Sequence, residues 1–153
     1  MAANNILEIE KDITYFLIDW KYYLNQLHRL QESLSTCTVK LTTVYEENKA
    51  SGGMVSSSVE RCVIKRAKIE EEIKNILDAM ELYITAINHA GLTQTEKDII
   101  KCLMNRKKLL KYAKEKNIYH SNVYKIKERA VRKIAEYILS DETTNRIYKR
   151  VKR

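Results

Sequence analysis

The chain has 153 residues, of which 44% are apolar, and it contains no proline and only three glycines. This length suits one domain or two small ones. The scarcity of turn-forming residues favours helices over a β architecture. The three cysteines are odd in number and form no CxxC motif, so we expect reduced thiols in a cytosol rather than a disulfide framework or a zinc site. Charged side chains interrupt the first apolar stretch, and we expect neither a signal peptide nor a membrane span.

Charge is divided unevenly along the chain, whose formal net charge is +8. Residues 1–90 carry 10 Lys and Arg against 13 Asp and Glu, a net charge of −3. Residues 91–153 carry 18 against 7, a net charge of +11. A basic third beside a slightly acidic remainder predicts a polyanion-binding module joined to a different region. A solvated basic surface without a partner is the alternative.

Residues 1–90 are expected to form a long-helix scaffold. Apolar side chains recur every three or four positions from Ile6 to Leu30, which predicts a helix over about residues 4–34. Serines and threonines then interrupt the pattern, because their hydroxyls compete for backbone hydrogen bonds. Together with the segment SGGMVSSS they predict a flexible loop near residues 38–57. The alternation in TVKLTTVY is also compatible with a short strand there.

A second apolar stripe runs from Val59 to Ile87 and predicts a helix over about residues 58–90. From Ile73 onward its steps follow a heptad. Gly91 comes where a helix commonly ends on a glycine with a left-handed backbone. The two long helices are expected to form an antiparallel pair. Their stripes are compatible with a plain core or with the interface of a homo-oligomer.

Shorter helices are predicted in the basic third, over about residues 94–104, 109–116 and 121–139. Thr93 and Glu96 have the spacing of a capping box before the first of them. Asn117 can take the left-handed turn after the second helix, and Ser121 is expected to cap the third. The tail after Leu139 is compatible with a short basic helix or a mobile end.

The segment from Leu109 to Ile138 has the pattern of a helix-turn-helix. The positions expected to be buried are Ala113, Ile118, Val123, Ile126, Ala130, Ile134 and Ile138. At about 100° per residue, polar and basic side chains fall on the opposite side of the last helix. We therefore expect a helix-turn-helix DNA-binding domain over residues 91–140 and a basic tail over residues 141–153. The charge division also predicts that residues 92–153 bind DNA by themselves.

The candidate DNA-binding residues are His120, Ser121, Asn122, Tyr124, Lys125, Arg129, Arg132, Lys107, Lys108 and Lys111. Asn122 and Lys125 are expected to read base edges, because Asn pairs with adenine and Lys donates to guanine. Arg129 and Arg132 lie further along the same face and are expected to contact phosphates. The lysines before and within the supporting helix would flank the DNA backbone. The expected partner is double-stranded DNA.

This segment resembles known transcription proteins. YAKEKNIYHSNVYKIKERAVRKIAEYI is similar to the region-4 helix-turn-helix of sigma factors, with Tyr112-Ala113, Ser121 and Arg129-Ala130 at the matching positions. The arrangement of SGGMVSSSVERCVIKRAKIEEEI, LTQTEKDII and the basic segment resembles RinA-type activators of phage late transcription, relatives of the ArpU family. The resemblance covers residues 51–140. The apolar stripes and capping residues predict an all-α chain. The resemblance implies a regulator, located in the cytoplasm of a bacterial host, that activates phage or prophage late genes together with host RNA polymerase.

Other classes of protein fit parts of this pattern. A small terminase subunit also joins a helix-turn-helix to helical oligomerisation segments, and assembly into a ring would favour it. A sigma-like factor would need a separate promoter-melting domain. An enzyme is not expected, because the three histidines are far apart and lack ligand spacing, and because no phosphate-binding loop is recognisable. We therefore predict no catalytic residue, no metal site and no cofactor. The basic tail lacks the large apolar face of a membrane-surface helix, so no membrane partner is expected.

Overall fold

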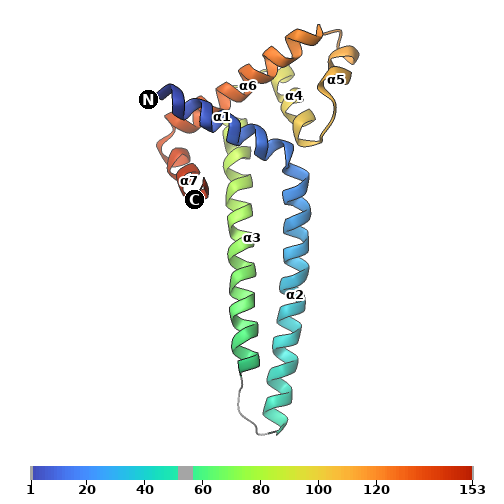
Figure 1. The fold of residues 1–153 in the computed structure, drawn as a ribbon, viewed down its shortest axis with the longest axis vertical. Helices are drawn as coiled ribbons and strands as arrows, with labels where there is room; N and C mark the ends of the chain where they lie inside the picture. Colours follow the sequence, from blue (N-terminus) through green and yellow to red (C-terminus); the bar gives the residue numbers. More distant parts are fainter. Residues whose placement is uncertain (1, 52–56, 153) are drawn as a thin grey trace. The chain divides into compact units, whose positions relative to one another are not determined.

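The structure, a computed structural model, describes residues 2–51 and 57–152, and these residues form helices without any strand. The all-α prediction is confirmed. The helices, traced in chain order in Figure 1, are α1 (Ala2–Ile18), α2 (Trp20–Ser51), α3 (Ser57–His89), α4 (Gln94–Met104), α5 (Leu109–Glu115), α6 (His120–Ser140) and α7 (Glu142–Lys152). The chain divides into two compact units, one formed by Met1–Tyr23 with Asp78–Arg153 and the other by Leu24–Leu77.

The main core of the first unit surrounds α6, which packs against α1, α4, α5 and α7. Its buried side chains are Ile9, Ile13, Leu17, Leu82, Tyr83, Ala86, Leu92, Ile100, Leu103, Ala130, Val131, Ile134, Ala135, Ile138 and Tyr148. The boundary expected near residue 91 lies inside this unit. The physical reason is that the inner face of α6 buries its apolar side chains against helices from both sides of that point.

Asp19 separates α1 from α2, so the single helix predicted over residues 4–34 is wrong. Arg106 Nε donates to the carbonyl of Ile18 at 3.1 Å, and its Nη2 lies 3.2 Å from Asp19 Oδ1. A side chain that bonds to a helical carbonyl inserts into the helical hydrogen-bond ladder and bends the helix. The apolar period gives no sign of this break, because the stripe continues across it.

The loop and the strand predicted after residue 37 are wrong within the described residues, where α2 continues to Ser51. Thr36 shows how the helix accommodates these residue types. Its Oγ1 donates to the carbonyl of Glu32, four residues earlier, at 3.1 Å. The hydroxyl is thereby satisfied without opening the helix. Residues 52–56 of the predicted loop lie outside the described residues.

In the second unit, α2 and α3 run in opposite directions (Figure 1). Cys37 Sγ donates across this hairpin to the carbonyl of Cys62 at 3.5 Å, and Ile69 is buried. Large apolar side chains nevertheless remain 45–55% exposed, namely Leu24, Val63, Ile64 and Leu77. The apolar stripe of α3 is therefore only partly covered within this unit.

The heptad that starts at Ile73 describes the buried face at the end of α3 only in part, because Met80 is buried and Ile87 packs against the core around α6. Leu82, Tyr83 and Ala86 are buried in the first unit, whereas Ile84, a heptad position, is 43% exposed. A heptad places apolar residues along a narrow seam, which suits the packing of two paired helices. The core around α6 is formed by several helices and takes side chains from a different side of α3.

Candidate nucleic-acid interface

A small core joins α4, α5 and the start of α6. Ile99, Ala113 and Val123 are buried in it, with exposures between 0% and 2%. The half-buried side chains around them are Leu109, Tyr112, Ile118 and Ile126. The expected burial of Ala113 and Val123 is confirmed. A small side chain at position 113 lets the two helices approach closely, because a larger one would have to displace its neighbours.

The turn between α5 and α6 is held by backbone geometry. Asn117 has a φ of 56°, which is the left-handed conformation that the sequence predicts. The N–H of Ile118 donates to the carbonyl of Ala113 at 2.7 Å, and the N–H of Asn117 donates to that of Lys114 at 3.4 Å. This pair of bonds is a Schellman motif, which satisfies the last carbonyls of α5 and redirects the chain.

The start of α6 corrects the predicted cap. Ser121 lies inside the first turn, because α6 begins at His120 and Tyr119 holds the N-cap position without a side-chain bond. The N–H groups of Asn122 and Val123 donate to the carbonyl of Tyr119 at 2.9 and 3.2 Å. Tyr119 follows the turn with an extended backbone, and the hydrogen bonds of α6 begin at its carbonyl. Tyr119 itself is 66% exposed, and its ring lies 4.5 Å from that of His120.

Polar and basic side chains occupy the outer face of α6. The residues predicted to bind DNA from this helix are all exposed, namely His120, Ser121, Asn122, Tyr124, Lys125, Arg129 and Arg132. Val123 and Ala130, on the inner face, are fully buried. Because its inner face is fixed in two cores, α6 has a defined orientation within the first unit.

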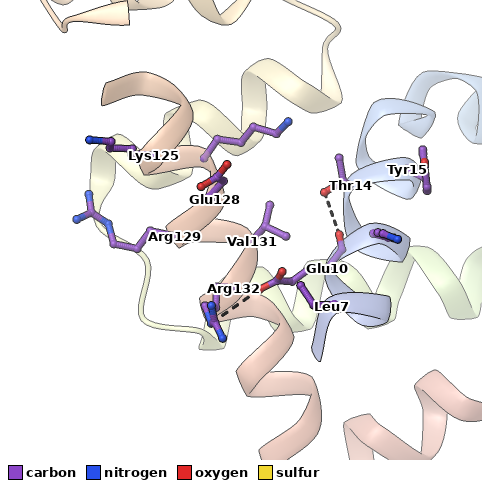
Figure 2. Close-up of a pocket in the computed structure, with 11 residues that line it drawn as sticks. Leu7, Glu10, Thr14, Tyr15, Lys125, Glu128, Arg129, Val131 and Arg132 are labelled. Atoms are coloured by element: carbon purple, nitrogen blue, oxygen red, sulfur yellow. Dashed lines mark hydrogen bonds and ion pairs between the residues drawn. The ribbon is translucent and has the colours of Figure 1, made fainter. Parts of the chain in front are cut away.

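A groove of about 750 Å³ runs between α6 and α1. Its lining is Leu7, Glu10, Lys11, Thr14, Tyr15, Lys125, Lys127, Glu128, Arg129, Val131 and Arg132. Figure 2 shows Lys125 and Arg129 extending from one side of α6, whereas Arg132 reaches toward Glu10 of α1. Five cationic side chains against two carboxylates give this lining an excess of positive charge. In the sequence, the only sign that α1 contributes to this groove is Tyr15, which lies beside the apolar stripe.

Arg132 differs from Arg129 in its surroundings. Its Nε lies 3.9 Å from Glu10 Oε1 and 3.7 Å from Glu136 Oε1. The Arg132 side chain is 59% exposed, and exposed ion pairs of this kind are worth only ~0–1 kcal/mol. The guanidinium group therefore stays available to an anion that offers a better fit.

The lysines ahead of α6 gather at a second hollow, of about 510 Å³. Lys107, Lys108 and Lys111 line it together with Tyr112, whose hydroxyl donates to Asp98 Oδ2 at 3.2 Å. Burial and the adjacent Asp98 carboxylate raise the pKa of Tyr112, so the phenol stays protonated. The predicted site residues thus fall into two groups, one along the outer face of α6 and one between α4 and α5.

A buried carboxylate ties α4 to α6 and was missed by the sequence reasoning. Glu96 is 1% exposed, and its Oε1 accepts from Lys133 Nζ at 2.7 Å. Thr93 and Glu96 form the predicted capping box, which is confirmed. Burial by itself raises the pKa of Glu96, but the hydrogen bonds from Lys133 and Thr93 outweigh it and hold the pKa below its usual value. The capping-box spacing signalled Glu96 as a helix-start residue but not its partner on α6.

Comparisons with protein-family models, with curated proteins and with solved structures found no match for this chain. Within residues 2–51 and 57–152, no three His, Cys, Asp or Glu side chains are grouped so as to hold a metal ion. The helices of that same part of the chain are too short or too polar to cross a membrane.

Proposed function

We propose that this chain binds double-stranded DNA sequence-specifically through the first turns of α6 and acts as a transcription regulator. The supporting observation is the buried contact of Val123 with Ile99 and Ala113. It fixes the inner face of α6, so that polar and basic side chains point outward from a helix that follows a tight turn. A helix presented in this way, with polar residues at its N-terminal end, suits the major groove.

The two groups of basic residues then have different roles. Asn122 and Lys125 lie in the first turns of α6, where side chains reach base edges. Arg129 and Arg132 lie further along, in the groove beside α1, where a helix leaving the DNA meets the phosphate backbone. Lys107 and its neighbours in the second hollow add positive charge, which attracts the polyanion.

The resemblance to phage late-transcription activators gives this proposal its finer form. It is consistent with a regulator that binds near a late promoter and cooperates with host RNA polymerase in a bacterial cytoplasm. The charge division of the chain, with +11 in residues 91–153, supports DNA as the polyanion.

The test is DNA binding by the full chain, measured by fluorescence anisotropy on a site selected from random DNA. Asn122→Ala or Lys125→Ala should cost about 1–3 kcal/mol on that site and relax base preference. Arg129→Ala should weaken binding to selected and random DNA alike, and should lower the salt slope by about 0.9.

Matched controls lie elsewhere in the first unit. Asn88 and Lys21 are exposed helical residues outside both groups, so Asn88→Ala and Lys21→Ala should leave binding unchanged. The proposal fails if Asn122→Ala and Lys125→Ala keep full affinity and sequence preference while circular dichroism shows a folded protein.

A further inference from the structure

A half-exposed stripe runs along α3 in the second unit. The α3 stripe consists of Val59, Val63, Arg66, Glu70, Ile73 and Leu77, which alternate in steps of four and three and therefore share one side of the helix. Val63 is 50% exposed and Leu77 is 45% exposed. Ile69, which is buried, lies about a quarter-turn away at 100° per residue. The hairpin thus covers one side of α3 and leaves the stripe beside it partly open, with Val59 and Ile73 half-buried and Val63 and Leu77 exposed.

Two charged residues stand at the centre of this apolar stripe. Arg66 Nε lies 3.1 Å from Glu70 Oε1, and the two side chains are 42% and 52% exposed. Polar side chains at seam positions cost stability, and they select the partner and register of paired helices. The α3 stripe therefore has the composition of a seam whose partner must offer both apolar surface and complementary charge.

The sequence of the stripe is self-complementary about Lys68. The pairs at equal distance from Lys68 are Val59 with Leu77, Val63 with Ile73, and Arg66 with Glu70. A twofold axis places residue i of one copy against residue j of the other and j against i. An antiparallel pair of α3 helices centred there sets apolar residues against apolar residues. It also sets each Arg66 beside Glu70 of the other copy, whereas a parallel, in-register pair would oppose like charges.

We infer that two copies of this chain associate through the α3 stripe as an antiparallel pair. The occupant of this face is a second copy, because the stripe supplies its own complement in apolar surface and in charge. This inference concerns the second unit only and does not depend on DNA binding.

The test exchanges charge between copies. Arg66→Glu makes position 66 acidic, so that like charges face each other in the antiparallel pair, and Glu70→Arg makes both central positions basic. Each variant alone should dimerise at least about tenfold more weakly than the unchanged chain. An equimolar mixture of the two variants should regain dimers, because every acidic centre then meets a basic one. Sedimentation equilibrium of the full chain measures the dissociation constants.

Within each variant chain, positions 66 and 70 carry like charges both alone and in the mixture. Any dimer regained in the mixture therefore comes from the contact between copies. Lys68→Glu and Glu72→Arg make the same charge changes on exposed positions outside the stripe and should leave the dissociation constant within about twofold. Circular dichroism confirms that every variant remains helical. The inference is overturned if the unchanged chain is monomeric at all concentrations, or if the mixture dimerises as weakly as either variant alone. It is also overturned if the Lys68→Glu and Glu72→Arg dimers dissociate as readily as those of Arg66→Glu and Glu70→Arg.

Discussion

Replacing Ile13 by alanine tests whether α1 supports the helix proposed to read DNA. Ile13 is fully buried in the core that surrounds α6. The change removes three carbon atoms, at about 0.8 kcal/mol of transfer free energy each, and leaves a cavity whose cost adds to that loss. The free energy of unfolding of the first unit should therefore fall by about 2–5 kcal/mol.

The chain provides its own probe for this measurement. Trp20 is its single tryptophan, it belongs to the first unit, and it is 8% exposed, with its ring 5.7 Å from that of Phe16. Its fluorescence in a urea titration reports the unfolding of this unit. A lower midpoint at an unchanged slope is the expected signature of lost stability.

Leu7→Ala is the matched control. Leu7 is on the same helix but is 55% exposed, so its truncation should change stability by less than about 1 kcal/mol. If Ile13→Ala proved no more destabilising than Leu7→Ala, α1 would not be part of the core around α6. The groove beside Arg129, which is lined by α1 and α6, would then also be placed wrongly.

Two further changes probe the supports of α4 and α5. Glu96→Gln should destabilise the protein at neutral pH. Because the hydrogen bonds from Lys133 and Thr93 hold the folded pKa of Glu96 below its ordinary value of 4.5, the carboxylate stabilises the fold above that pH. The advantage of the unchanged chain over Glu96→Gln should disappear as the pH falls through the folded pKa, which a series of urea titrations from pH 7 downward would reveal. Asn117→Ala should cost about 1–2 kcal/mol, because its φ of 56° is strained for alanine, whereas Asn117→Gly should not. If thermal melts showed that Asn117→Ala and Asn117→Gly lose the same stability, the left-handed backbone at position 117 would not be the cause.

Local signals in the sequence predicted the elements where a single physical rule decides the outcome. Thr93 with Glu96, Asn117 and Gly91 are each confirmed, because a capping box and a left-handed residue depend on a few neighbouring atoms. The buried residues beneath the α5–α6 turn, Ala113 and Val123, followed from spacing alone. Burial of both, together with the left-handed turn at Asn117, is the part of the candidate site that could be predicted from the sequence.

Tertiary contacts decided what the sequence could not supply. The break at Asp19 depends on Arg106, far along the chain, which bonds to the carbonyl of Ile18. The groove beside α6 needs α1 to pack there, and no periodic pattern identifies the partner of a stripe. The partner of Glu96 could not be predicted either. Lys133 lies among basic residues of α6 that are expected to face solvent, and nothing in the sequence distinguishes it from them.

The length of α6 links the candidate interface to the rest of the first unit. Its 21 residues span about 31 Å at 1.5 Å per residue. The first half carries Val123, which belongs to the small core with α4 and α5. The second half carries Ile134 and Ile138, which are buried in the core with α1 and the end of α3. A helix held at both ends cannot rotate to suit a ligand without repacking two cores. The outer face of α6 is therefore preorganised, and a fragment that lacks α1 would lose the packing of Ile9, Ile13 and Leu17 that helps to orient it.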